Sequence, residues 1–339
     1  MERAKVTSAD VAARAGVSQS AVSRVFTPGA SASPKTVEKV RRAAAELGYR
    51  PNVLARAMVS GKSRIIGLVV AYLENQFYPV ALERLSNALQ AQGYHILIFT
   101  ATNSIDGADA VVQELMDYQV DGIITASVAI SSTLADSANA AGIPVVLFNR
   151  GQDDSGFSSV TSTNFEGGRK AAEFLLAGGH ERIAHIAGWQ GSSTGRDRQA
   201  GFLSVLQRAG VTPFAMVDGM YKHEVATECA RQLIAGSTRP DAIFVGNDHM
   251  AFAVMDVLRQ AGLEPGKDVS VVGYDDVPLA GWAAYDLTTI RQPVNRMVDA
   301  AVETILAQIE TPGTAPQQIE IEGKLILRSS ARIPEGWTQ

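Results

Sequence analysis

The stretch VTSADVAARAGVSQSAVSRV, residues 6–25, predicts two short helices joined by a tight turn. Thr7 can cap the first helix, with Asp10 three residues later at its positive end. Gly16 ends that helix because glycine adopts a left-handed backbone at little cost. Ser18 then caps a second helix. This arrangement is typical of a helix-turn-helix and predicts that the protein binds a DNA duplex.

The second predicted helix separates an apolar face from a polar one. Its outward positions hold Gln19, Ser20, Ser23 and Arg24. Glutamine and arginine can form bidentate hydrogen bonds with base edges. A third helix is predicted from the cap-and-proline pair Ser33–Pro34 to Gly48. The first fifty residues therefore predict a small all-α DNA-binding domain.

Charge is divided unevenly along the chain. The first 64 residues hold twelve lysines and arginines against four acidic residues, a net charge of +8. The whole chain of 339 residues carries −5, so residues 65–339 carry −13. DNA phosphates attract the first part and repel the second. A basic run that coincides with a capped helix pair favours nucleic-acid binding over an ordinary solvated face.

Composition narrows the class of protein. A chain of 339 residues, 46% of them hydrophobic, is long enough for two or three domains with large cores. Cys229 is the only cysteine, which excludes an intrachain disulfide, and no histidine pair has the spacing of a metal site. The N-terminus lacks the apolar stretch of a signal peptide, and no uncharged apolar run reaches membrane-spanning length. We expect a soluble, cytoplasmic protein without a cofactor.

Residues 51–63 separate the basic domain from the rest of the chain. Val53 to Lys62 could form barely two helical turns, and so short a helix is marginal in water. Gly61, Lys62 and Ser63 have the composition of a linker. These residues leave two readings open, a hinge helix that orders when the protein binds DNA and an ordinary linker.

From residue 64 onward, strand-like and helical patterns alternate, which predicts an α/β fold with parallel sheets covered on both faces. The predicted strands are 65–70, 94–99, 122–125, 144–148, 182–187, 242–245 and 269–272. Asp121–Thr125 resembles Asp241–Val245 at an offset of 120 residues, which indicates two similar lobes. Two facing lobes form a cleft at the carboxyl ends of their strands, where ligands bind.

Several separated motifs resemble the lactose-repressor (LacI/GalR) family of bacterial transcription regulators. The motifs are residues 10–12, 15–18, 22–25, 47–52, 55–56, 66–68, 247–248, 271–276 and 287–290. Each motif alone is weak, but their order and spacing are specific, and they extend over essentially the whole chain. The resemblance implies a helix-turn-helix domain followed by a two-lobed core like a type I periplasmic binding protein.

The resemblance also implies a homodimer that binds a pseudo-palindromic operator in double-stranded DNA and senses a small effector. It implies a DNA-binding domain at 1–50, a hinge helix and linker at 51–63, an N-terminal lobe at 64–162 and 293–322, and a C-terminal lobe at 163–292 and 323–339. The residues that it places on DNA are Thr7, Ser18, Gln19, Ser20, Ser23, Arg24, Asn52, Arg56 and Met58.

Two positions depart from the family pattern. The family usually has a leucine where a hinge side chain wedges into the central base step, and this chain has Met58. Methionine is apolar and can act as such a wedge, although it is more flexible. An aspartate usually precedes the asparagine at the lobe crossover, and here the pair is Thr163–Asn164. The family's ligand or interface role is therefore not carried over to Thr163.

Polar and aromatic side chains follow several predicted strands at their carboxyl ends. The resemblance places Phe77, Tyr78 and Arg198 in the effector cleft. Ser127 and Asn149 follow strands at equivalent ends, and the predicted set is completed by Tyr221, Asn247 and Asp275. Aromatic rings there suit stacking on a sugar or a base, although one of the adjacent rings could instead pack against the next helix. The set suits a polyol, a sugar acid or a similar small polar metabolite.

Enzyme motifs are weak in this chain. Gly191–Gly195 matches the G-x-S-x-G nucleophile elbow, but Gly188–Gln190 separates it from the preceding strand and spoils the sharp turn. Neither a Walker A sequence nor a dinucleotide glycine fingerprint is present. The sequence therefore predicts an effector-responsive transcription regulator rather than an enzyme. We expect this regulator to be a repressor of sugar or related carbon-source genes. The alternative is a sugar-binding protein of the periplasmic type without a DNA role, against which the basic N-terminal domain argues.

Overall fold

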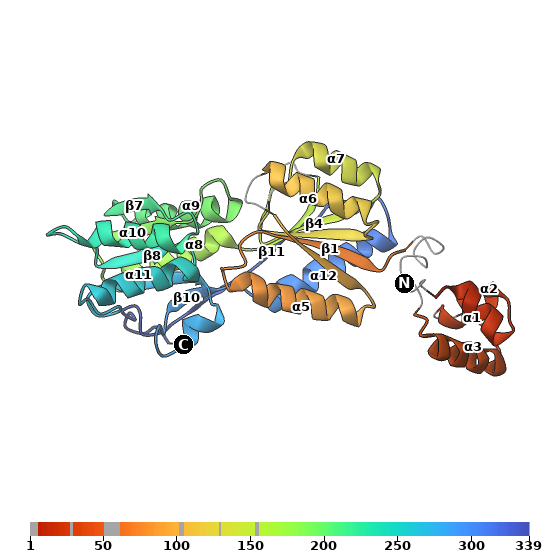
Figure 1. Cartoon of the computed structure of the whole chain (residues 1–339). Coiled ribbons are helices and arrows are strands. Elements are labelled where there is room, and N and C mark those ends of the chain that lie inside the picture. The colour runs from red at the N-terminus through yellow and green to blue at the C-terminus, as the bar shows by residue number, and fades with distance from the viewer. Residues whose placement is uncertain are drawn as a thin grey trace. The chain divides into compact units, whose positions relative to one another are not determined.

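The computed structural model describes residues 6–27, 30–50, 62–101, 105–128, 130–152 and 156–338. In it the chain divides into two compact units, residues 1–63 and 64–339. The described residues of the first unit form the helices α1 (Ser8–Ala15), α2 (Gln19–Phe26) and α3 (Pro34–Leu47) (Figure 1). All three begin and end within a residue or two of the predicted positions.

Local hydrogen bonds explain the bounds of α1 and α2. Thr7 and Asp10 form a reciprocal capping box, in which the Thr7 amide donates to Asp10 Oδ2 at 2.8 Å. Gly16 has φ of 65°, a conformation that glycine adopts without the penalty that a Cβ atom imposes. Ser18 Oγ accepts from the Ala21 amide at 3.2 Å and starts α2. The helices enclose a core of Val11, Ala12, Val22, Val40, Ala43 and Ala44.

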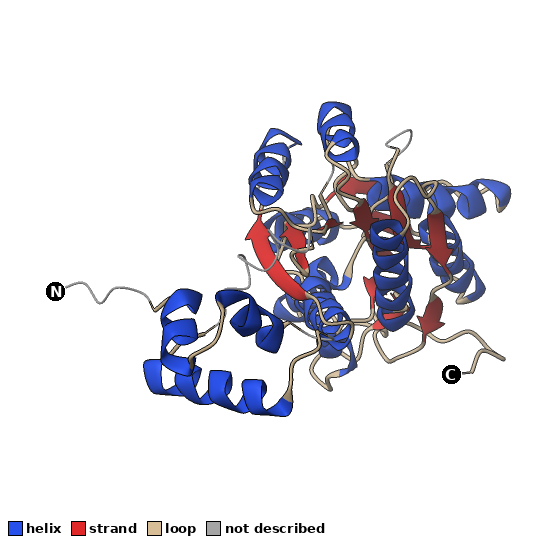
Figure 2. Ribbon diagram, turned by 90° about the vertical axis from the view of Figure 1, so that its right-hand side faces the viewer, coloured by secondary structure: helices blue, strands red, loops and turns tan. Residues whose placement is uncertain are grey.

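The second unit contains two six-stranded sheets, with helices on both faces of each (Figure 2). The first sheet has the strand order β11-β5-β4-β3-β1-β2. Its strands are β1 (Ile65–Val70), β2 (His95–Thr100), β3 (Gly122–Ala126), β4 (Val145–Phe148), β5 (Ser158–Ser162) and β11 (Gln318–Ile321). Its helices are α5 (Phe77–Ala91), α6 (Ile105–Asp117), α7 (Ser132–Ala140) and α12 (Val294–Glu310). All its pairings are parallel. We call this half the first lobe.

The second lobe repeats the arrangement with the strand order β12-β10-β9-β8-β6-β7. Its strands are β6 (Ile183–Ala187), β7 (Ala215–Asp218), β8 (Ala242–Val245), β9 (Ser270–Asp275), β10 (Thr288–Arg291) and β12 (Lys324–Ile326). Its helices are α8 (Asn164–Ala177), α9 (Ser193–Arg208), α10 (His223–Ile234), α11 (Asp248–Gln260) and the short 3₁₀ helix η1 (Pro278–Gly281). The repeated segments are β3 and β8, which occupy the same place in the two sheets. One pairing, β10 with β12, is antiparallel, unlike the purely parallel sheets that the pattern predicts.

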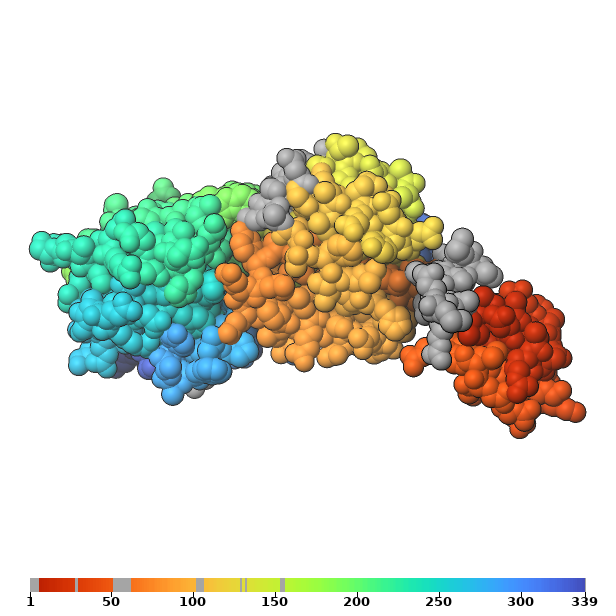
Figure 3. Space-filling model, in the orientation of Figure 1, coloured from red at the N-terminus to blue at the C-terminus, as the bar shows by residue number. Residues whose placement is uncertain are grey.

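The central strands of the core are buried because helices cover both faces of each sheet. In the first lobe, α6 and α7 pack on one face with Ile123 and Leu147, and α5 and α12 pack on the other with Ile124 and Phe148. The chain passes between the lobes after β5, after β10 and after β11. Figure 3 shows the surfaces of the two lobes adjoining each other. Within the described residues, no helix is both long and apolar enough to cross a membrane.

The backbones of α8 and α9 approach each other at two glycines. A Cβ atom at Gly201 would lie 1.9 Å from the Phe165 carbonyl oxygen, and one at Gly168 would lie 2.0 Å from the Arg198 carbonyl oxygen. Backbone atoms cannot yield as flexible side-chain ends do. We predict that Gly201→Ala lowers the free energy of unfolding by about 1–3 kcal/mol or more, measured by urea denaturation. Gly281→Ala is the control, because its Cβ would stay 3.7 Å from Arg328. Equal stability of the two variants would contradict the close contact.

His185 lies in the core of the second lobe, where its ring stacks on Phe244 with centroids 4.8 Å apart. Burial lowers the pKa of His185 to about 4. The unfolded chain, with an ordinary histidine pKa near 6.5, therefore takes up the proton first. We predict that stability falls by up to about 3 kcal/mol as the pH drops from 6.5 to 4, and that His185→Phe reduces this loss. Urea unfolding at both pH values measures it, with exposed His95→Gln as the control. An unchanged loss in His185→Phe would refute the assignment.

Candidate functional site

The polar face of α2 lies on the surface, as a DNA-reading helix requires. Gln19, Ser20, Ser23 and Arg24 are all exposed. The ion pairs among the described residues of this unit join other arginines to Glu46, so Arg24 is left outside them. The predicted phosphate contacts Thr7 and Ser18 are also exposed, and both act as helix caps.

The remaining residues that the resemblance places on DNA are Asn52, Arg56 and Met58. They lie outside the described residues, as does most of the segment 51–63. Their roles in a hinge stay predictions.

A cavity of about 530 Å³ lies between the two lobes of the core. Seven of the eight predicted effector residues line it, namely Tyr78, Ser127, Asn149, Arg198, Tyr221, Asn247 and Asp275. They come from the carboxyl ends of strands, the loops that follow them and the first two turns of the next helices, in both lobes. The cavity therefore lies where parallel α/β sheets usually bind ligands. Its volume is within the range of small-molecule sites.

Unusual backbone conformations gather around this cavity. Five of its lining residues have φ in the left-handed region: Tyr72 (30°), Ser127 (63°), Asn149 (56°), Tyr221 (58°) and Asp275 (124°). Non-glycine residues seldom adopt such values, and they persist only where surrounding structure holds them. Such strain is concentrated at functional sites in proteins, which supports a binding role for the cavity.

Arg198 is the buried cation of the second lobe and is 3% exposed. Its Nε donates to Asn164 Oδ1 at 2.9 Å, and its Nη1 donates to the Gly246 carbonyl oxygen at 2.7 Å. The same Nη1 lies 3.7 Å from Asp275 Oδ1, and the guanidinium stacks 3.6 Å from the centroid of the Tyr274 ring. These contacts fix the orientation of the planar guanidinium while leaving it at the cavity wall.

Asp275 connects the two lobes. Its Oδ1 accepts from Gln292 at 2.7 Å, and its Oδ2 accepts from Asn75 of the first lobe at 3.3 Å. Burial raises its pKa, and the nearby Arg198 opposes this effect. The neighbouring Asp248 is fully buried, and burial together with the charge of Asp275 raises its pKa well above the usual value. The Asp248 carboxylate accepts hydrogen bonds from Thr289 Oγ1 at 2.6 Å and from the Val277 amide at 3.0 Å, and so fixes these two segments in place.

Two buried amide side chains at the cavity each leave one polar atom without a hydrogen bond to the described residues. These atoms are Asn149 Oδ1, an acceptor, and Asn247 Nδ2, a donor. The other ends are engaged, since Asn149 Nδ2 donates to Tyr78 Oη at 3.2 Å and Asn247 Oδ1 caps α11 at Met250. Burial raises the pKa of Tyr78 to about 12, so its hydroxyl stays neutral. Buried polar atoms without a partner are rare in proteins, so these two are candidates for hydrogen bonds with a polar ligand.

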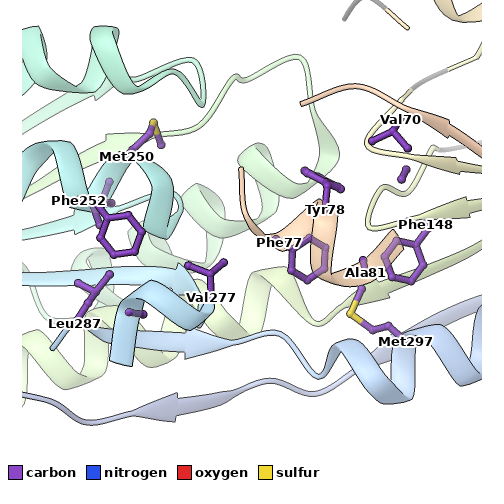
Figure 4. Packing of buried hydrophobic residues seen from close by; sticks show 14 of the residues in the cluster. Val70, Phe77, Tyr78, Ala81, Phe148, Met250, Phe252, Val277, Leu287 and Met297 are labelled. Atoms are coloured by element: carbon purple, nitrogen blue, oxygen red, sulfur yellow. The ribbon is translucent and has the colours of Figure 1, made fainter. Parts of the chain in front are cut away.

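Phe77 does not line this cavity. Its ring is 4% exposed and packs against Tyr78 and Phe148, with ring centroids 5.3 Å and 6.3 Å away (Figure 4). Phe77 borders a separate cavity of about 490 Å³, whose lining also includes Asp275. Of the two adjacent rings, Tyr78 therefore faces the predicted site and Phe77 packs in the core. Adjacent helical positions point in directions about 100° apart, so both rings cannot share one wall.

Sequence reasoning missed several residues at the site. Asn75 and Thr194 line the cavity, and Asn164 orients Arg198. Asn75 lies in the predicted loop before Phe77, where any polar residue was a candidate. Thr163 makes no side-chain cap to α8, whereas Asn164 beside it forms the contact that matters.

A helix-turn-helix unit together with a two-sheet core that holds a cavity between its lobes defines the class of ligand-sensing DNA-binding regulators. Residues 7–52 match the family model described as bacterial regulatory proteins, lacI family. Residues 172–331 match the model of a periplasmic binding protein-like domain.

Curated relatives and solved structures agree with these matches. The chain is 33% identical over 328 residues to the HTH-type transcriptional repressor PurR of Erwinia tasmaniensis, with 95% of each chain covered. It is likewise 33% identical to PurR of Pectobacterium carotovorum, again with 95% of each covered. A lac repressor dimer bound to operator and the anti-inducer ONPF superposes with a TM-score of 0.87 at 29% identity, covering 97% of this chain and 100% of that one. A complex of the transcriptional regulator CelR with cellobiose gives 0.72 at 31% identity, covering 96% and 100%.

The chain therefore belongs to the lacI family of bacterial regulatory proteins. It is a DNA-binding transcription regulator with a periplasmic-binding-like core, as the sequence motifs predict.

Proposed function

We propose that this protein is a repressor that binds a palindromic operator as a homodimer and changes its operator affinity when a small polar effector enters the cavity between the lobes. The observation that supports this most directly is the cavity itself, which places Arg198, Asp275 and two incompletely bonded amides around one space. We further propose that the segment 51–63 transmits the change from the core to the DNA-binding unit.

The operator proposal rests on the exposed face of α2. Exposed Gln19 and Arg24 suit base contacts, and exposed Thr7 and Ser18 suit phosphate contacts. Two such helices in a symmetric dimer would read half-sites about one turn of DNA apart. The lac repressor that this chain resembles was solved as an operator-bound dimer.

The effector proposal rests on the chemistry of the cavity wall. Tyrosine rings, amides and an oriented guanidinium are groups that bind sugars and other hydroxyl-bearing or acidic metabolites. We therefore propose a sugar, a sugar acid or a similar metabolite as the effector, and control of sugar or related carbon-source genes. A nucleobase is the competing ligand class, because an aromatic wall with amide groups also suits a planar base. A thermal-shift screen of the full-length protein against all three classes separates them, since a ligand of the folded state raises its stability.

The recognition helix provides one test of this proposal. Arg24→Ala should weaken binding to a duplex selected from a random pool by the wild-type protein, by about tenfold or more, because a bidentate base contact contributes roughly 1–3 kcal/mol. Fluorescence anisotropy at fixed salt measures the loss. Arg42→Ala, an exposed arginine of α3, is the control. Unchanged affinity of Arg24→Ala would remove α2 from the DNA contact. Failure of the wild type to select any duplex would instead favour a ligand-binding protein without a DNA role.

A second prediction concerns the cavity. Arg198→Ala should abolish the effect of the screened ligand on operator affinity, because it removes the oriented cation at the cavity wall. Operator binding without ligand should persist. Arg208→Ala, an exposed position in the last turn of the same helix, is the control. Circular dichroism checks that Arg198→Ala is folded, since the variant leaves Asp275 without its cation. A folded variant with a normal ligand response would show that the effector binds elsewhere.

A further inference from the structure

A second buried arginine lies beside the cavity, and neither the sequence prediction nor the proposed function uses it. Arg150 follows Asn149 at the carboxyl end of β4 and is 3% exposed. Its Nη2 makes a long hydrogen bond of 3.5 Å to Ser127 Oγ, and its Nε has no hydrogen-bond partner within the described residues. Both Ser127 and Asn149 line the cavity. Since a guanidinium does not lose its proton in proteins, a full positive charge is buried there.

The carboxylates of the site do not neutralise Arg150. Asp275 is committed to Arg198, with further hydrogen bonds from Gln292 and Asn75. Asp248 is turned toward Thr289 and the Val277 amide. None of the ion pairs found among the described ranges includes Arg150.

Among the described residues, the polar groups found around Arg150 are hydroxyls and another cation. The nearby titratable groups are the cavity tyrosines Tyr72, Tyr78 and Tyr221, whose hydroxyls are neutral near neutral pH, and the exposed Arg196. Burial lowers the pKa of Arg150, because removal from water disfavours the charged form. An isolated buried charge is costly in a protein unless an opposite charge and hydrogen bonds compensate it.

Two helices add to the positive field at the same place. Thr194 in the first turn of α9 and Asn247, the N-cap of α11, both line the cavity. Helix N-termini favour anions because their amides and dipoles are positive there. The free carboxylates of the cavity, Glu74 and Glu224, are exposed at its rim, where Lys222 is also found. The buried part of the cavity is therefore cationic.

We propose that the effector carries an acidic group, a carboxylate or a phosphate, and that Arg150 binds this group. This inference rests on the proposed function, in which the cavity binds the effector. Arginine presents parallel N–H donors that match both anions in a bidentate pair. Nε and the weakly engaged Nη2 form one such edge of the guanidinium. The acidic group would thus supply the opposite charge that the described residues lack.

Arg150 also lies where the lobes touch, which gives the bound anion a second consequence. Its guanidinium is 5.5 Å from the ring centroid of Trp189 in the second lobe. The next residue, Gly151, donates its amide to Ser193 Oγ across the same boundary at 3.0 Å. A ligand held by Arg150 therefore acts on a contact between the lobes, which is where an effector must act to change the core.

Matched ligand pairs test this proposal. Isothermal titration of the full-length protein at fixed pH and ionic strength would compare D-glucose with D-glucuronate, D-galactose with D-galacturonate, and D-glucose with D-glucose 6-phosphate. The first two pairs test a carboxylate and the third a phosphate. We expect the acidic member of at least one pair to bind about tenfold tighter or better than its neutral partner, as for a charge-assisted hydrogen-bonded pair. Absence of an acid preference in all pairs would overturn the proposal.

Substitutions separate charge recognition from a merely structural role. Arg150→Gln should reduce the preference for the acid to below about threefold while leaving the affinity of the neutral partner unchanged, and Arg150→Lys should retain part of the preference. Arg208→Gln is the control, because Arg208 is an exposed arginine on α9. Equal loss of acidic and neutral ligands in Arg150→Gln would show that Arg150 only supports the fold.

A measurement without any ligand tests the premise that the charge is unpaired. Arg150→Met should keep or raise the unfolding temperature of the unliganded protein, since it replaces a buried charge that has no ion-pair partner among the described residues by an apolar chain of similar length. A lower unfolding temperature would overturn the premise. The proposed function is tested separately by operator binding and by Arg198→Ala. If these succeed and the acid preference is absent, only the anion assignment fails.

Discussion

The burial of two opposite charges between the lobes constrains the whole core. Arg198 and Asp275 are almost fully removed from solvent, and each needs hydrogen bonds in addition to the other's charge. Asp275 takes them from Asn75 in the first lobe and from Gln292 beside a connection between the lobes. Arg198 donates one to Asn164, which begins the helix after another connection. The ion pair thereby joins the cavity wall to two of the segments that connect the lobes.

Sequence reasoning was most accurate where local chemistry decides the structure. The N-terminal helices are predicted almost to the residue, because caps such as Thr7 and Ser33 and the turn at Gly16 act through neighbouring residues only. Strands such as β1 and β8 are also predicted, because their continuous apolar runs are visible in the local sequence. Strand β5, with the sequence SSVTS, is missed although it is fully buried. Its serines satisfy their hydroxyls through distant partners such as Gln308 and Tyr274, and no local pattern reveals such contacts.

The candidate effector site was predictable in outline and not in detail. Strand ends are readable in the sequence, and seven of the eight residues predicted for the site line the cavity. Which of two adjacent rings faces the cavity depends on how α5 is rotated against β4, and packing rather than pattern sets that rotation. Arg150 was missed because a single arginine after a strand resembles an ordinary surface charge. Only its burial and its lack of a carboxylate in the described structure distinguish it.

The three passages of the chain between the lobes have a consequence for biosynthesis. The first lobe obtains its edge strand β11 and its covering helix α12 from residues 294–321, after nearly all of the second lobe has been made. Until then the apolar face formed by residues such as Leu68, Ile124 and Phe148 lacks half of its cover. A growing chain therefore leaves the ribosome with the N-terminal helices complete and the following sheet unfinished. Such exposed apolar surface attracts chaperones and invites aggregation, so a late stop codon damages the part of the core that was translated first.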